Sequence, residues 1–214
     1  MKFTPSQYVS YIVKVAEYIS KNGEYITELD AATGDGDHWL NINIGYQKIR
    51  EISDELKLLD SFQILFNRLA KLIMSSMGGT SGALYGGAYM ASAKLLGDIK
   101  NIDANQLADM LYCWEVTIMR MGNTEVGFKT MIDTLHPAVV QYREALDSDK
   151  KIKDALLIMK AAAWDGANST KDMEAFRGRA SNQPGKGVGH LDPGAVTMAM
   201  QLECLVDYLV ENCI

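Results

Sequence analysis

The run LDAATGDGDHWLNIN occupies residues 29–43 and contains too many Gly and Asp residues to be a regular helix or strand. In a helix, at roughly 100° per residue, Asp30 and Asp35 would point about 140° apart, and Asp35 and Asp37 about 160° apart. The three carboxylates can meet only if the segment is a loop, and its two glycines supply the conformational freedom for that. The segment is therefore predicted to be a loop between helices.

Acids brought together in this way repel each other, by about 4 kcal/mol for a pair about 4 Å apart at an effective dielectric constant near 20. A cation removes that cost, and an all-oxygen ligand set favours magnesium or calcium. The spacing does not fit an EF-hand, whereas magnesium held by a few carboxylates keeps positions open for phosphate oxygens. The alternative is a solvated Asp/Gly turn that only caps the next helix. His38 fits either a phosphate or base contact or a structural hydrogen bond.

On both sides of this loop, apolar residues recur every three or four positions, which is typical of amphipathic helices. Alternating β patterns are scarce, and most connections are short, so the sequence predicts an all-α, antiparallel up-and-down bundle. No repeat or linker is visible, and residues 1–214 are expected to form a single domain. The first expected helix begins near Ser6 and ends at Asn22. Seven more are expected at about 42–52, 62–73, 83–96, 104–120, from 129 onward (with Pro137 near its start or at a kink), 151–168 and 194–211.

The connections hold nearly all the Gly-rich and acidic motifs. Because alternate connections of an antiparallel bundle lie at the same end, the chemistry is predicted to lie at one end of the molecule.

Composition narrows the functional classes. The chain has 214 residues, 48% hydrophobic and 22% charged, with a net charge of −6. The negative charge argues against nucleic-acid binding, which needs clustered Lys and Arg. The three cysteines form no CxxC pair, no apolar run approaches the roughly 18 residues of a membrane span, and no secretory signal is visible. We therefore expect a cytoplasmic protein without a membrane or nucleic-acid partner.

Three further glycine-containing segments have the composition of anion sites. Gly78–Gly82 precedes a helix and could present backbone amides to an anion, although it lacks the GKS or GKT of a P-loop. Gly127–Met131 could place the Thr130 hydroxyl and helix-start amides on a phosphate, with Lys129 as countercharge. Each segment has a simpler interpretation, a close helix connection for the first and a plain helix start with a solvated Lys for the second.

The third segment runs from GRAS, residues 178–181, to GHLDPG, residues 189–194. It could supply Arg179 to a phosphate and a tight turn at a helix start. The simpler interpretation is a Pro/Gly turn capped by Asp192.

Together, LDAATGDGDHWLNIN, MGGTSGALYG, GFKTMID, GRAS and GHLDPGA resemble, in order and spacing, the L subunit (DhaL type) of dihydroxyacetone kinases. These motifs extend from about residue 29 to residue 195. The resemblance implies an antiparallel barrel of about eight helices with ADP or ATP bound at one rim. It implies two Mg²⁺ ions held by Asp30, Asp35 and Asp37. The implied nucleotide contacts are His38, Asn41, Gly79, Thr80, Ser81, Thr130, Met131, Arg179, Asp192, Pro193 and Gly194.

The same resemblance implies a function. The nucleotide is a retained cofactor that is rephosphorylated by a phosphohistidine-bearing M-type subunit of the phosphotransferase system. Its γ-phosphoryl passes to dihydroxyacetone held on a separate K-type subunit, with Arg179 as the catalytic residue that neutralises charge. A homodimer is a further expected partner. Two alternatives stay open: a nucleotide-sensing regulatory module, and an ATP-dependent kinase subunit for another substrate.

The sequence departs from the family pattern at three places. Trp39 replaces the usual Gly after GDGDH, Phe128 replaces the usual acid before Lys-Thr, and residues 182–188 lack the usual Tyr-Leu-Gly run. Trp39 is expected to narrow the rim or to stack there. These departures keep a related hydroxy-carbonyl substrate open as an alternative to dihydroxyacetone.

Overall fold

The protein is all-helical in a computed structural model that describes residues 1–214. The predicted all-α architecture of about eight antiparallel helices is confirmed, and two short helices, α2 and α4, add to the eight long ones. The α-helices are α1 (Pro5–Lys21), α2 (Gly23–Ala31), α3 (His38–Glu51), α4 (Ser53–Leu56), α5 (Phe62–Ser76), α6 (Gly79–Leu96), α7 (Ala104–Gly122), α8 (Ile132–Asp147), α9 (Ile152–Ser169) and α10 (Pro193–Asn212). Short 3₁₀ turns follow α9, namely η1 (Thr170–Asp172), η2 (Arg179–Asn182) and η3 (Pro184–Gly187).

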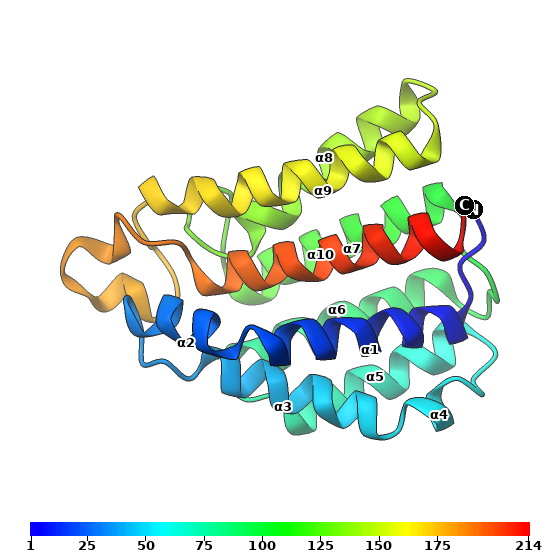
Figure 1. The fold of residues 1–214 in the computed structure, drawn as a ribbon, viewed down its shortest axis with the longest axis horizontal. Coiled ribbons are helices and arrows are strands. Elements are labelled where there is room, and N and C mark those ends of the chain that lie inside the picture. The colour runs from blue at the N-terminus through cyan, green and yellow to red at the C-terminus, as the bar shows by residue number, and fades with distance from the viewer.

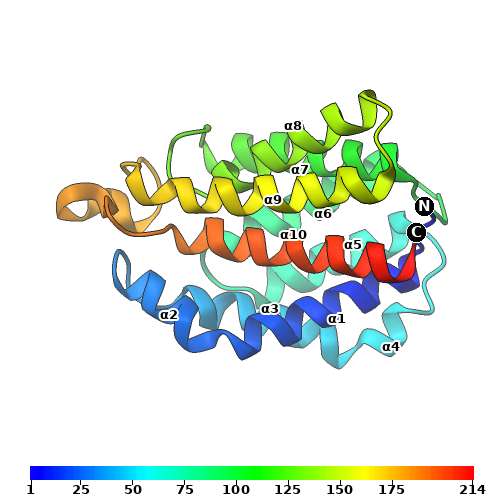
Figure 2. The ribbon, with the colours of Figure 1, turned by 45° about the horizontal axis from the view of Figure 1, so that its top comes forward.

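The eight long helices close into a ring. Packing contacts connect them in the cyclic order α1, α3, α5, α6, α7, α8, α9, α10 and back to α1. The chain runs up one helix and down the next, so both termini lie at the same end (Figures 1 and 2). The connections α2–α3, α5–α6, α7–α8 and α9–α10 lie together at the other end, as the up-and-down topology requires.

Helix starts are fixed mainly by local capping. Thr4 and Asp103 form capping boxes with Gln7 and Gln106, and the Ser61 hydroxyl caps α5. Three starts differ from the sequence prediction: α3 begins at 38 rather than near 42, α6 at 79 rather than 83, and α8 at 132 rather than 129. Periodicity detects where a helix buries a face, so it misses the first turns of α3 and α6, which line a pocket. In α8 the predicted start is too early, because residues 129–131 form a turn in which Lys129 has a positive φ.

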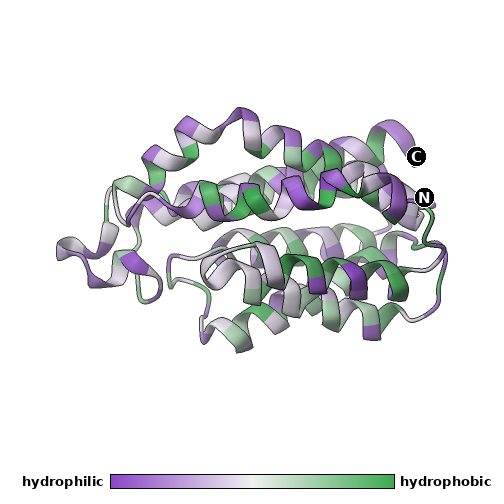
Figure 3. Ribbon diagram, turned by 90° about the horizontal axis from the view of Figure 1, so that it is seen from below, coloured by the Kyte–Doolittle hydropathy of each residue, from purple (hydrophilic) through white to green (hydrophobic).

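The core fills the inside of the ring. One continuous cluster of 55 buried hydrophobic residues extends from Phe3 to Leu209. Figure 3 shows hydrophobic colour along the helix bodies and hydrophilic or pale colour over the protruding α9–α10 connection. No helix combines the length and the apolar composition that a membrane crossing requires.

Helices α8 and α9 pack with very close backbone contact. A Cβ atom added to Gly166 of α9 would lie 2.2 Å from the Asp133 carbonyl oxygen and 2.8 Å from Cγ of Pro137. Pro137 lies inside α8 and cannot donate to that carbonyl, as a residue four positions later normally does. The glycine therefore accommodates the prolyl turn of α8, which is the helix that starts beside the pocket.

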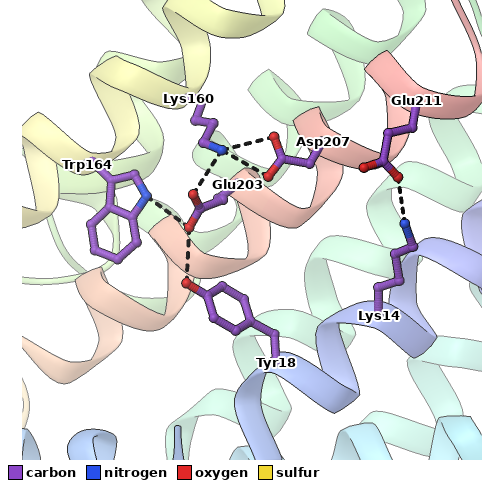
Figure 4. A network of polar contacts seen from close by, with 7 residues as sticks. All are labelled: Lys14, Tyr18, Lys160, Trp164, Glu203, Asp207 and Glu211. Carbon is purple, nitrogen blue, oxygen red and sulfur yellow. Dashed lines mark hydrogen bonds and ion pairs between the residues drawn. The ribbon is translucent and has the colours of Figure 1, made fainter. Parts of the chain in front are cut away.

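A polar network joins α10 to both of its neighbours on the outside of the ring (Figure 4). Glu203 forms an ion pair of 2.9 Å with Lys160, and it accepts hydrogen bonds from the Tyr18 hydroxyl at 3.2 Å and from Nε1 of Trp164 at 3.3 Å. Burial, together with the Glu203 charge, raises the pKa of Tyr18 to about 12. One carboxylate thus links α1 and α9 through α10.

We expect Glu203→Ala to lower the free energy of unfolding by about 1–3 kcal/mol, because it leaves half-buried donors of Tyr18 and Trp164 without an acceptor. Glu211→Ala is the matched control on the same helix, since its 2.8 Å pair with Lys14 is exposed and should contribute less than about 1 kcal/mol. Urea denaturation measures both. Equal losses would show that the Glu203 network adds nothing to an ordinary surface ion pair.

Candidate nucleotide and metal site

A pocket of about 430 Å³ opens at the end of the ring where the four connections meet. Residues from α2–α3, α5–α6, α7–α8 and α9–α10 line it. Every candidate site residue identified in the sequence lies in this lining: Asp30, Asp35, Asp37, His38, Asn41, Gly79, Thr80, Ser81, Thr130, Met131, Arg179, Asp192, Pro193 and Gly194. The fold thus brings together five motifs whose lining residues run from Asp30 to Gly194, 164 positions apart in the chain.

The three acids of the first motif converge. One carboxylate oxygen from each of Asp30, Asp35 and Asp37 lies within 4.8 Å of the others. Asp30, at the end of α2, is buried, and it accepts a hydrogen bond of 3.0 Å from the His38 amide at the start of α3. A Cβ at Gly34 would lie 2.5 Å from Oδ1 of Asp30, so only glycine lets the loop close on this carboxylate. The oxygen donors fit a hard divalent cation such as Mg²⁺.

Arg179 provides the positive charge next to these acids. Its Nη2 atom lies 2.6 Å from Oδ2 of Asp35 and 3.8 Å from Oδ2 of Asp37. The Arg179 side chain is 64% exposed, so it can move toward a bound anion with little loss of packing. The contact also shows that the acidic loop and the GRAS segment, far apart in the sequence, meet at the pocket.

The start of α6 is the open anion site among the helix starts that line the pocket. Gly78 is its N-cap, and no side chain accepts from its first amides. Free amides and the positive end of the helix dipole favour an anion at this point. Gly78 also leaves room for Asn41, because a Cβ at position 78 would lie 2.1 Å from Oδ1 of Asn41 and would displace that side chain. The Thr80 and Ser81 hydroxyls lie in this first turn, inside the helix rather than in the expected preceding loop.

Acids occupy amides at the start of α10 and in the segment that precedes α8. Asp133 accepts from the Gly127 amide and, at 2.7 Å, from the Thr130 amide, while Asp192 accepts from the Ala195 amide at 2.7 Å. A phosphate at residues 127–131 would therefore have to compete with Asp133 for the Gly127 and Thr130 amides. The sequence prediction did not assign a role to Asp133, although acids are common in the first turn of a helix, where they interact with its amides.

His38 is compatible with both roles expected from the sequence. It lines the pocket, and it makes a structural contact, with Nε2 3.0 Å from the Thr197 hydroxyl of α10. Burial lowers the pKa of His38, against the opposing effect of Asp30 and Asp37. The ring is therefore neutral near pH 7 and bonds as a donor or an acceptor without adding charge.

Lys129 lines the pocket and is not the solvated lysine of a plain helix start. It is buried, with 1% of its surface exposed, and it adopts a left-handed conformation with φ of 58°. Its ammonium group donates to the carbonyl oxygens of Thr170 and His190, at the two ends of the α9–α10 connection. Burial lowers the pKa of Lys129, and the nearby carboxylates, first Asp192, oppose that shift.

Trp39 lies away from the pocket, so the expectation that it narrows the rim is wrong. Its Nε1 donates to the Ile19 carbonyl at 3.1 Å, and its ring covers Gly23, where an added Cβ would lie 2.6 Å from the indole. Trp39 therefore fastens α3 to the junction of α1 and α2. The pocket also has lining residues outside the five motifs, namely Ile118, Gly122, Thr124 and Arg177, and two residues within the motifs that were not expected to line it, Thr33 and Leu84. Leu84 and Ile118 are apolar and lie in the bodies of α6 and α7, where they look like core residues in the sequence.

Asp192 gives the site a pH dependence that can be measured. Burial raises the pKa of Asp192 to about 7, although its hydrogen bond from Ala195 and the charge of Lys129 lower it. The unfolded chain ionises this acid near pH 4, so between these values the folded state alone holds the proton. Without divalent cations, stability should therefore fall as the pH rises toward 7, by at most about 1.4 kcal/mol per unit.

Asp192→Asn should flatten this dependence, because the amide still accepts from Ala195 and does not titrate. Urea denaturation at pH 5, 6, 7 and 8 in a chelator tests the expectation. Equal slopes for both proteins would contradict it.

Comparison with known proteins agrees with this geometry. Residues 32–207 match the DAK2 domain family. The chain is 31% identical to the ADP-binding subunit DhaL of the PEP-dependent dihydroxyacetone kinase of Escherichia coli K12, over 96% of this chain and 97% of that one. It is 33% identical to the ADP-binding subunit DhaL of the PTS-dependent dihydroxyacetone kinase of Lactococcus lactis, over 93% of this chain and 95% of that one.

The fold is also that of a solved kinase. The crystal structure of the dihydroxyacetone kinase from C. freundii in complex with AMP-PNP and Mg²⁺ superposes with a TM-score of 0.73 at 25% identity. The match covers 93% of this chain and 33% of the larger kinase chain. With its sequence matched over nearly its full length, this chain belongs to the DAK2-domain family of DhaL-type subunits.

Proposed function

We propose that this chain holds Mg²⁺–ADP or Mg²⁺–ATP as the nucleotide subunit of a dihydroxyacetone kinase, and that residues 1–214 form one domain for this purpose. The observation that carries the proposal is that oxygens of Asp30, Asp35 and Asp37 lie within 4.8 Å of one another, in the same pocket that the open start of α6 lines. A cation site beside an anion site is the arrangement that a metal-bound polyphosphate requires.

Each part of the pocket has a separate task. The three acids would hold the metal, which we propose to be a pair of Mg²⁺ ions, and the ions would neutralise charge on the phosphates. The amides of Gly79–Ser81 and the Thr80 and Ser81 hydroxyls bind the phosphate oxygens. The buried side chains of Leu84, Ile118 and Met131 give the pocket an apolar wall on which a nucleobase can lie.

Arg179 is proposed as the catalytic residue. Transfer of a γ-phosphoryl group places charge on its peripheral oxygens, and a guanidinium group next to them lowers the barrier. Because Arg179 is exposed at the rim and pairs with Asp35, it can turn to the phosphoryl group when a cation takes over the neutralisation of the acids. His38 and Asn41 in the first turn of α3, and Thr130, Asp192, Pro193 and Gly194 on the opposite side, complete the walls.

The division of labour follows from the resemblance. The acceptor hydroxyl of dihydroxyacetone, or of a related hydroxy-carbonyl compound, is presented by a K-type subunit, and the ADP left behind is rephosphorylated by a phosphohistidine-bearing M-type subunit. The regulatory alternative could use Trp39 as a contact surface at the rim, but Trp39 packs on Gly23 instead. Trp39 therefore gives that alternative no support.

The test begins with the purified full-length chain. Mass spectrometry of the denatured protein should find ADP or ATP in near-stoichiometric amount, and calorimetry on stripped protein should show ADP binding that requires Mg²⁺. Phosphotransfer is then measured with K-type and M-type subunits, and with excess ATP in place of the M-type subunit. A protein that carries no nucleotide and binds none in Mg²⁺ would overturn the proposal.

A further inference from the structure

The connection between α9 and α10, residues 170–192, here called the arginine loop, carries Arg179 and has almost no core packing of its own. Between residues 171 and 190 only Ala175 and Gly187 are buried. Large buried apolar side chains normally fix a segment in place, so the position of this loop depends on a small number of identifiable contacts.

The first contact closes the neck of the loop. The Lys129 ammonium donates to the carbonyls of Thr170 and His190, which begin and end the loop. The Gly189 amide donates to the Lys171 carbonyl at 2.7 Å beside it. Lys129 has no carboxylate within ion-pair distance, is buried, and has a left-handed backbone. These features cost folding free energy, and such costs are commonly retained at functional sites.

The second contact holds the outer part of the loop and starts from the neighbouring residue. The Phe128 carbonyl accepts from the Phe176 amide at 3.2 Å, and the two rings lie 5.0 Å apart. The Arg177 guanidinium lies 5.8 Å from the centre of the Phe128 ring and also donates to the Asn123 carbonyl. Arg179 follows two residues later, with its guanidinium on Asp35.

We propose that Phe128 and Lys129 are positioning residues that tether the arginine loop at two points and so hold Arg179 over the acidic cluster. Neither needs to touch the nucleotide. Their effect is to slow nucleotide release, because a tethered loop keeps Arg179 near the phosphates while an untethered loop moves away. This inference rests on the proposed nucleotide function and names the residues that make the cofactor a retained one.

The decisive experiment is a double-mutant cycle on nucleotide dissociation, measured by stopped-flow with a fluorescent ADP analogue in Mg²⁺. Lys129→Met removes the charged donor but keeps the length of the side chain, and should speed release by up to about tenfold, which is the loss of affinity expected when Arg179 itself is removed. Phe128→Ala should speed it by about fivefold. Added to Arg179→Ala, either change should have little further effect, since the tethers act through Arg179.

Lys171→Met is the matched control, because it removes one positive charge from an exposed loop residue whose backbone carbonyl alone is used. It should leave release within twofold of wild type. Phe128→Tyr keeps the ring and should restore slow release, which a merely disturbed fold would not do. If Lys129→Met fails to fold, the partly exposed Phe128 decides the question by itself.

Hydrogen exchange in the absence of nucleotide separates this proposal from the function on which it rests. The Ala175 and Gly189 amides, bonded to the Lys186 and Lys171 carbonyls, should exchange faster in Lys129→Met. Unchanged exchange and unchanged release would overturn the tether, and so would effects that add fully to those of Arg179→Ala. Failure of wild-type protein to bind ADP, with faster loop exchange in the variant, would count against the nucleotide function and leave the tether standing.

Discussion

Asp35→Ala is expected to weaken Mg²⁺-dependent ADP binding by at least roughly a hundredfold, since even the loss of an outer partner of a metal ligand commonly costs 10- to 100-fold. Asp35 is one of the three carboxylates whose oxygens meet within 4.8 Å. Without it, two acids face the cation and the remaining shell must be water. Calorimetric titration of the stripped protein with ADP, at several Mg²⁺ concentrations, measures the loss.

Two controls show whether the charge and the position of Asp35 cause the loss of ADP binding. Asp35→Asn keeps the shape of the side chain and removes its charge, so it should lose most of the same binding. Asp54→Ala removes a fully exposed acid of α4, near the opposite end of the ring, and should change nothing. Wild-type affinity in Asp35→Ala with an unchanged dependence on Mg²⁺ would contradict a metal site in this loop.

Arg179→Ala is expected to lower phosphotransfer turnover by about a thousandfold, while ADP affinity falls by only about tenfold. The difference follows from the chemistry, because charge on the transferred group is greatest during transfer and a guanidinium group stabilises that state most. Arg179→Lys keeps the charge but loses the planar two-point contact, so its turnover should lie between those of wild type and Arg179→Ala. The rate is measured with a K-type subunit, dihydroxyacetone and saturating nucleotide.

The matched control is Arg68→Ala, an exposed arginine of α5 without an ion-pair partner. It should leave both turnover and affinity at the wild-type level. If Arg179→Ala loses affinity and turnover by the same factor, Arg179 binds the ground state and the transition state equally, and the catalytic assignment is wrong.

The convergence of the site was predictable from the sequence because it follows from topology. Short connections force neighbouring helices to run antiparallel, and alternate connections must then lie at one end. The GDGDH, GGTSG and GRAS segments lie on alternate connections, and the structure places them around one pocket. The identity of the acids also limited the ligand, since clustered carboxylates without a cation repel each other.

Which helix starts remain open to an anion was not predictable from the motifs. Gly78–Ser81 and Gly127–Met131 look equally suitable in the sequence, as glycine segments before a helix. The difference is one carboxylate: Asp133 occupies the amides of the second segment, whereas no side chain occupies those of the first. An acid in a first turn is compatible with capping, with metal binding or with exposure, and only its neighbours decide among these.

The sequence by itself determined the helices, their up-and-down order and the end of the molecule at which the chemistry lies, because these depend on periodicity and chain connectivity between near neighbours. The tertiary structure alone decided the roles of Lys129 and Trp39. Lys129 is buried because the Thr170 and His190 carbonyls, 41 and 61 residues away, surround its ammonium group, and Trp39 turns away from the rim because Gly23 leaves space for an indole. Burial and hydrogen-bond partners depend on residues that are distant in the chain, so a local sequence pattern does not predict them.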